Sequence, residues 1–152
     1  MISRRGFLLL GVAGMANAQL PPNIQEIRKK AFDEAIRKVV GNAQVRHGKV
    51  KLDVPPLIDN GNTVPLSVEV DSPMSAADHV RTIHVFTERN PQPNVLSAHL
   101  GPRAGKARVA TRARIADTGM VTAIAQMSDG SFWSDSVKVI VTLSACLEEG
   151  LI

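Results

Sequence analysis

The chain is poor in aromatic residues. Among its 152 residues there is no tyrosine, a single tryptophan and four phenylalanines. Valine and alanine must therefore supply most of any core, and β-branched residues of this kind favour strands over a large helical bundle. A chain of this length has room for one domain with a substantial core.

Cysteine is almost absent as well, because the chain contains only Cys146. A lone cysteine cannot form an internal disulfide or supply a thiolate metal cluster. In an oxidising compartment, three states remain open to such a thiol: buried and inert, paired with another molecule, or chemically active.

Motifs of catalysis are also missing. No Gly-x-Ser-x-Gly is present, and 101–106 resembles a phosphate-binding loop in composition only, since a strand pattern follows it instead of a helix. The histidines have no zinc-site spacing, and surface or strand-face positions are expected for His47, His79, His84 and His99. We therefore expect no metal and no cofactor, and an enzyme is the least favoured class.

The amino terminus has the form of an export signal. Ser3-Arg4-Arg5 with Phe7 and Leu8 matches the twin-arginine pattern, and an apolar run leads to the small residues 16–18. Cleavage is expected between Ala18 and Gln19, with delivery to the periplasm. The run is about half the length that crosses a bilayer as a stable helix, so an uncleaved anchor is the less favoured alternative.

Removing residues 1–18 removes two arginines and no acid, so the net charge falls from +4 to 16 − 14 = +2. This charge is too small to indicate a nucleic-acid partner. Twin-arginine export carries folded proteins, which usually hold a cofactor or travel with a partner. Because no cofactor motif is found, the pattern favours a protein partner.

Residues 23–40 carry the clearest helical pattern. Asn23 is a plausible N-cap with Glu26 three residues later, and Gly41 is placed to end the helix. One apolar stripe is expected to contain Ile24, Ile27, Ala31, Ala35 and Ile36. The helix should pack on the domain's own sheet or on a partner, and the acids among its charges disfavour a membrane surface.

Beyond residue 49, apolar residues recur at every second position instead of every third or fourth. Seven strands are expected, at 50–54, 63–70, 80–87, 95–100, 108–115, 120–127 and 137–143. In the fifth strand, inward positions are predicted for Val109, Thr111, Ala113 and Ile115, and outward positions for Arg108, Arg112 and Arg114. Pro65 belongs at a strand start or at an edge.

Turns recur at intervals near 8–12 residues, which predicts a mainly β protein with an immunoglobulin-like antiparallel β-sandwich and an N-terminal amphipathic helix. A sheet with protected edges packed on a helix is the competing architecture. The expected organisation is a signal at 1–18, a helix arm at 19–45, the sandwich at 46–143 and a C-terminal tail at 144–152.

Cys146 follows the last expected strand by three residues, which place its sulfur up to ~10 Å from the sheet end. An accessible thiol is partly thiolate at neutral pH and can be captured by an activated sulfur compound. The alternative is a thiol buried against the body by the apolar tail residues Leu147, Leu151 and Ile152.

Several blocks of the chain resemble SoxY, a covalent carrier of periplasmic thiosulfate oxidation. The resemblance rests on residues 60–74, on Asn90-Pro91 with Pro93, on 111–114, on 121–132 and on 137–139. It implies an immunoglobulin-like sandwich that pairs with a SoxZ-like subunit and is exported in that complex.

The resemblance further implies that Cys146 carries sulfur intermediates covalently. In the family, a haem enzyme loads thiosulfate, a dimanganese hydrolase removes sulfate, and in some organisms a molybdenum–haem enzyme oxidises the remaining sulfur. The carrier itself catalyses nothing.

The tail departs from the family pattern. Family members end in Gly-Gly-Cys-Gly-Gly, whereas here Cys146 is flanked by Ser144-Ala145 and by Leu147-Glu148-Glu149. Such residues are bulkier and less free in φ than glycine, and the acids disfavour a thiolate nearby. The alternative hypothesis is therefore a divergent binding or assembly module, associated with a periplasmic dehydrogenase and lacking carrier activity.

Overall fold

A computed structural model describes residues 19–143, and these form one helix, nine strands and one 3-10 turn. In chain order the elements are α1 (Pro22–Val40), β1 (Val45–His47), β2 (Val50–Asp53), β3 (Leu57–Asn60), β4 (Val64–Val70), β5 (Val80–Thr87), β6 (Asn94–His99), η1 (Pro102–Ala104), β7 (Arg108–Ala113), β8 (Gly119–Met127) and β9 (Phe132–Leu143).

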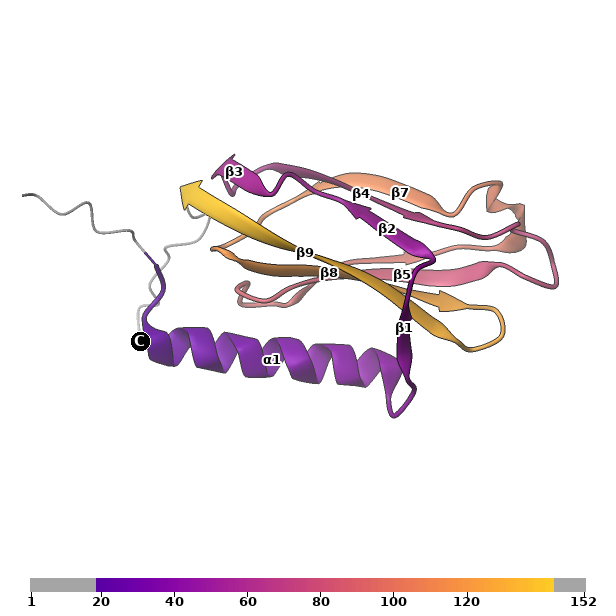
Figure 1. The fold of residues 1–152 in the computed structure, drawn as a ribbon, viewed down its shortest axis with the longest axis horizontal. Coiled ribbons are helices and arrows are strands. Elements are labelled where there is room, and N and C mark those ends of the chain that lie inside the picture. The colour runs from indigo at the N-terminus through magenta and orange to yellow at the C-terminus, as the bar shows by residue number, and fades with distance from the viewer. Residues whose placement is uncertain (1–18, 144–152) are drawn as a thin grey trace, which may run out of the picture.

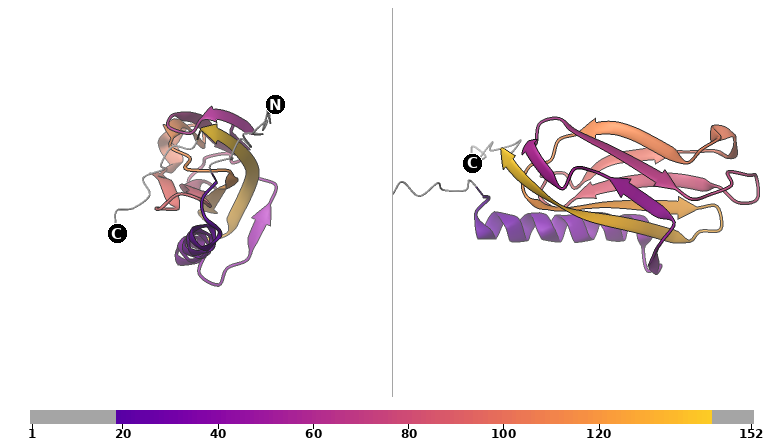
Figure 2. Two further views of the ribbon diagram at one scale, coloured as in Figure 1. Left: turned by 90° about the vertical axis from the view of Figure 1, so that its left-hand side faces the viewer. Right: turned by 45° about the horizontal axis from the view of Figure 1, so that its top comes forward.

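The strands form two sheets that face each other, with α1 lying along the outside of the larger one (Figure 1). The larger sheet has the order β1-β9-β8-β5-β6, with β3 also paired to β9, and the smaller has the order β2-β4-β7. Figure 2 shows the helix end-on beneath the two layers. The predicted mainly β sandwich with an N-terminal helix is confirmed.

β9 connects most of the larger sheet. It pairs antiparallel with β8 over most of its length, parallel with β1 at its beginning and parallel with β3 at its end. The seven expected strands correspond to β2 and β4–β9, but β9 begins at Phe132 instead of 137. β1 and β3 were missed because they have three and four residues and no clear alternation.

The main core fills the space between the sheets. Its buried side chains are mostly valine and isoleucine, and β4 alternates buried and exposed positions along its whole length, as the period of two predicts. Pro65 is exposed and lies at the second residue of β4, before the part paired with β2. Pro65 was expected at a strand start or at an edge; it is the second residue of β4, the middle strand of the smaller sheet, where it pairs with Arg112 of β7.

One inward prediction for β7 is wrong. Thr111 is exposed and Val109 and Ala113 are only half-buried, although Ile115 is buried. β7 is an edge strand of the smaller sheet, so the facing sheet covers it incompletely. Arg108, Arg112 and Arg114 are exposed, as predicted.

A second, smaller core lies between α1 and the outer face of the larger sheet. Phe32 is the buried residue of the helix, and its ring meets Phe86 edge-on at a centroid distance of 6.5 Å and an angle of 89°. Ile124 and Phe132 complete this core from β8 and β9. The helix therefore packs on the domain's own sheet, which was the first of the two alternatives.

The helix begins one residue earlier than predicted. Pro22 is its first residue and no side chain caps it, so Asn23 is not the N-cap. Proline fits this position because its missing N–H would have no intrahelical partner. Gly41 does end the helix, with φ +58° and its N–H donating to the Arg37 carbonyl at 2.8 Å.

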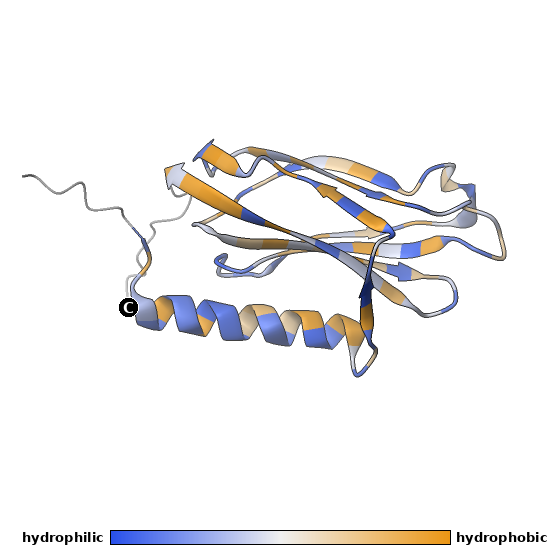
Figure 3. Ribbon diagram, in the orientation of Figure 1, coloured by the Kyte–Doolittle hydropathy of each residue, from blue (hydrophilic) through white to orange (hydrophobic). Residues whose placement is uncertain are grey.

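The predicted apolar stripe is interrupted in the first half of α1. Ile27 is 62% exposed, whereas Gln25 and Arg28 are half-buried toward the body. Figure 3 shows that the apolar positions of the helix concentrate in its second half. Among residues 19–143, no helix is both long and apolar enough to cross a membrane.

Candidate functional site

The candidate site is the end of the sandwich where β9 finishes. Cys146 and Ala18 lie outside the described residues, whereas Gln19 is described and exposed. The site therefore consists here of the strand that leads to Cys146 and of the cavity beside it.

The end of β9 is held firmly up to its last residue. The Gly61 N–H donates to the Leu143 carbonyl at 3.0 Å, and the Thr142 hydroxyl donates to the Asp59 carbonyl at 3.0 Å. The Val141 N–H donates to the Thr118 hydroxyl oxygen, also at 3.0 Å. The last three residues of β9 are thus each hydrogen-bonded to β3, to the residue after it or to the residue before β8, and Leu143 lies three residues before Cys146.

Apolar side chains are exposed along this end. Leu57 of β3 lies opposite Ile140 of β9, and their exposed fractions are 60% and 52%. Leu143 is 66% exposed. Figure 3 shows apolar stretches on β3 and on the end of β9, side by side.

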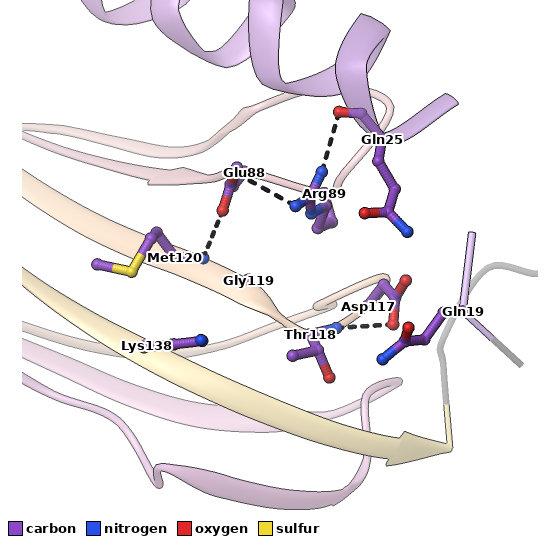
Figure 4. A pocket seen from close by; sticks show the side chains of 9 residues that line it. All are labelled: Gln19, Gln25, Glu88, Arg89, Asp117, Thr118, Gly119, Met120 and Lys138. Carbon is purple, nitrogen blue, oxygen red and sulfur yellow. Dashed lines mark hydrogen bonds and ion pairs between the residues drawn. The ribbon is translucent and has the colours of Figure 1, made fainter. Parts of the chain in front are cut away.

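A cavity of about 380 Å³ lies between the beginning of α1 and the strands β8 and β9 (Figure 4). Its lining is mostly polar and consists of Gln19, Gln25, Glu88, Arg89, Asp117, Thr118, Gly119, Met120 and Lys138. Only Gln19 among these was expected to have a role, as a cleavage position. Asp117-Thr118-Gly119 has a composition typical of a turn, so its sequence does not indicate a site.

Both acids of the cavity are engaged by the backbone. Asp117 accepts the Thr118 N–H at 2.7 Å on Oδ1 and the Leu20 N–H at 3.1 Å on Oδ2. Glu88 accepts the Met120 N–H at 3.0 Å on Oε2, while its Oε1 lies 3.4 Å from Arg89 Nη2. These bonds hold the loops at the cavity in place.

Arg89 joins the cavity to the helix. Its Nη1 donates to the Gln25 carbonyl at 2.9 Å, and its own carbonyl accepts from Arg28 Nη1 at 2.7 Å. The bond from Arg28, and the bond from Gln25 Nε2 to the Leu20 carbonyl, explain why these two side chains face the body where an apolar stripe was expected. The contacts of Arg89 span more than sixty residues of sequence, so no local pattern could reveal them.

The histidines are distributed over the fold as expected, on strands and surface loops. His84 Nδ1 lies 2.8 Å from the Ser97 hydroxyl, and burial together with the nearby His99 lowers the pKa of His84. Within residues 19–143, no three His, Cys, Asp or Glu side chains are grouped as a metal site would require.

Comparison with known families identifies the chain. The model of the SoxY family, described as sulfur oxidation protein SoxY, matches residues 36–146. The chain belongs to the SoxY family. The matched segment reaches Cys146, so the family pattern extends across the end of β9 into the tail.

Solved structures agree with this assignment. The sulfur carrier protein SoxY from Chlorobium limicola f thiosulfatophilum superposes with a TM-score of 0.62 at 27% identity, covering 75% of this chain and 98% of that one. A sequence comparison with curated proteins returns no match.

A superoxide reductase (neelaredoxin) from Ignicoccus hospitalis shares the fold, with a TM-score of 0.53 at 17% identity over 62% of this chain and 80% of that one. The superoxide reductase from Nanoarchaeum equitans has a TM-score of 0.52 at 10% identity, covering 63% and 100%. Identities this low show a common architecture alone. The SoxY match assigns this member of the fold to sulfur oxidation as a carrier protein and not as an enzyme.

Proposed function

We propose that this SoxY-family protein carries sulfur intermediates covalently on Cys146 in the periplasm. The observation that supports the proposal is the family match, which ends at Cys146, combined with the fixed position of Leu143 three residues earlier. A rigid strand followed by a short tail lets the thiol reach a visiting active site while the body remains folded.

The proposed chemistry needs the thiolate of Cys146 and an external oxidant. The Cys146 thiolate and the outer sulfur of thiosulfate form an S–S bond, and the two electrons released would pass one at a time through the haem of the partner enzyme to that enzyme's electron acceptor. Hydrolysis by a second enzyme then releases sulfate and leaves one sulfur atom on the cysteine. In this scheme the protein is a substrate of each enzyme in turn.

Export and pairing belong to the same proposal. The twin-arginine pattern supports transport in the folded state, and cleavage between Ala18 and Gln19 would release the mature chain. We propose a SoxZ-like subunit as the stable partner. The exposed Leu57, Ile140 and Leu143 support a protein contact near the tail, because such apolar side chains gain most from burial.

The departure of the tail from the glycine-rich family pattern favours a second candidate function. In that candidate, Leu147 and its apolar neighbours hold the thiol against the body, and the chain acts as a binding or assembly module associated with a periplasmic dehydrogenase. The two functions differ in the accessibility of one thiol, which is measurable because the chain has no other cysteine.

Intact-mass measurement tests the carrier function. Protein purified from cells grown on thiosulfate should carry mass additions that a reductant removes, and Cys146→Ser should carry none. A Ser144→Ala variant, two residues away, serves as the matched control and should retain the additions. An unmodified mass in wild-type protein under these conditions would exclude the carrier function.

Native thiol labelling separates the two candidates. A carrier should react with a maleimide at a rate within a few-fold of the urea-denatured chain. Protection that ends only on denaturation would instead support the binding module.

A further inference from the structure

Asp117 is a buried carboxylate without a cationic partner in the described part of the chain. Its exposed fraction is 4%, and no Lys, Arg or His nitrogen of residues 19–143 lies within 4.0 Å of it. Its two hydrogen bonds come from backbone N–H groups. Acidic side chains are rarely buried to this extent unless a positive charge accompanies them.

The backbone beside Asp117 is the segment that would begin the chain after the proposed cleavage. Leu20 is 7% exposed, its N–H donates to Asp117 Oδ2 at 3.1 Å, and its carbonyl accepts from Gln25 Nε2 at 2.5 Å. Gln19 lines the same cavity (Figure 4). Leu20, the second residue after the expected cleavage point, is thus bound to the sandwich, and Gln19 lies exposed at the cavity.

We propose that Asp117 is the binding site for the α-ammonium group that signal cleavage creates on Gln19. The inference rests on the proposed function in one respect, which is cleavage between Ala18 and Gln19. Before cleavage the Gln19 nitrogen is a neutral peptide N–H, and after cleavage it is a cation.

Backbone geometry places this cation close to the carboxylate. Consecutive backbone nitrogens are separated by about 3–3.6 Å, and the nitrogen of Leu20 is already hydrogen-bonded to Asp117. The new ammonium group therefore lies within reach of direct or water-bridged pairing. In a partly enclosed cavity, such a pair is screened less than one on the open surface.

The other charges of the cavity do not compete for this role. Glu88 and Arg89 pair with each other at 3.4 Å, and Arg89 also binds the Gln25 carbonyl. Lys138 is exposed on β9. Asp117 is therefore the acid of the cavity whose charge lacks a described partner, and cleavage supplies one.

Cleavage would also affect the attachment of α1. Leu20 precedes the helix by two residues, and Gln25 and Arg28 connect the first turns of α1 to the loop of Arg89. Pairing between the Gln19 α-ammonium and Asp117 would fix the start of the helix to the sandwich. Removal of the signal would thus stabilise the folded chain besides releasing it.

The test compares chains that begin at Gln19 with chains that begin at Ala18, in which the charge is moved by one residue. The chain beginning at Gln19 should melt a few degrees higher, and Asp117→Asn should abolish this difference. Asp53→Asn, an exposed acid on β2, is the control and should preserve it. Equal melting temperatures for the two wild-type chains would overturn the proposal.

A second measurement covers the case in which Asp117→Asn does not fold. The pKa of the Gln19 α-amino group, followed by NMR in the folded wild-type chain, should be raised above the ordinary value of a terminal amine. An unshifted value would overturn the proposal. Facing groups that must be included in the interpretation are Glu88, Arg89 and Lys138.

Chemistry at Gln19 provides an independent outcome. The α-amine can attack the side-chain amide carbon of Gln19 and release ammonia, which leaves a neutral ring. Exported protein that lacks the mass of ammonia would carry no α-ammonium, and the proposal would fail. None of these outcomes affects the sulfur-adduct test, so failure here and failure of the carrier function are distinguishable.

Discussion

Gly119 occupies a position where a side chain would displace its neighbours. A Cβ atom there would lie 2.8 Å from Arg89 Cγ and 3.2 Å from Glu88 Oε2, the oxygen that accepts the Met120 N–H. We expect Gly119→Ala to lower the free energy of unfolding by about 1–2 kcal/mol, because accommodating the methyl group disturbs that hydrogen bond. Urea denaturation measures the change.

Gly101 is the matched control for this substitution. Its φ of −122° suits any residue, and a Cβ atom there would meet nothing within 4 Å. Gly101→Ala should change the free energy of unfolding by less than about 0.5 kcal/mol. Equal effects of the two substitutions would show that Arg89 and Glu88 can move away from the added methyl group without lowering the free energy of unfolding.

His84 should make stability depend on pH. Burial, and secondarily the nearby His99, lower the pKa of His84 from its ordinary value of 6.5, so the folded state takes up this proton less readily than the unfolded state. The free energy of unfolding should therefore be highest above pH 6.5 and should fall as the pH decreases below it.

Urea midpoints measured between about pH 5 and pH 8 check this sign. His84→Gln should flatten the decrease, while His47→Gln, at an exposed histidine, should leave it unchanged. A steeper decrease in His84→Gln would contradict the assignment.

The sequence alone singles out Cys146, which stays a prediction, whereas it does not reveal the residues that line the cavity beside β9. Cys146 stood out by being single and by its place after the last strand. Asp117 did not, because its partner Leu20 is 97 positions away and a short Asp-Thr-Gly segment is typical of a turn. Contacts between residues so far apart in the sequence produce no periodic pattern in it.

Phe32 is the buried side chain through which the helix contacts the sheet. Phe32 is 8% exposed and meets Phe86 edge-on, whereas Ile27 on the same helix is 62% exposed. Phe32→Ala should cost about 3 kcal/mol of unfolding free energy through lost burial and a cavity, and Ile27→Ala less than about 0.5 kcal/mol. Chemical denaturation of the two variants gives the comparison. Similar costs for both would mean that the helix is held mainly by its polar contacts.

Strands long enough to show a clear alternation of apolar and polar residues were predictable, and shorter strands were not. Strands such as β4 alternate over seven residues, so their existence follows from the chain. β1 and β3 have too few residues to show a period, and each is a strand because β9 offers it a parallel edge. The start of α1 was misplaced because a proline, and not a capping side chain, begins it.

The whole molecule depends on β9, which has twelve residues and pairs with three other strands. A chain truncated after Leu143 keeps every described strand and should melt within a few degrees of the mature protein. A chain truncated after Lys138 loses the buried Val139 and Val141 and the pairing with β3, so it should show no cooperative transition. Circular dichroism during heating distinguishes these results, and a cooperative transition in the shorter chain would contradict the central role of β9.

The late position of β9 in the sequence also determines when the nascent chain can fold. Before β9 has been synthesised, β1 and β3 have no edge to pair with and β8 lacks one of its two neighbours. The larger sheet can therefore form only after β9 has left the ribosome. A polypeptide terminated before β9 would leave these strands unpaired and exposed to proteolysis.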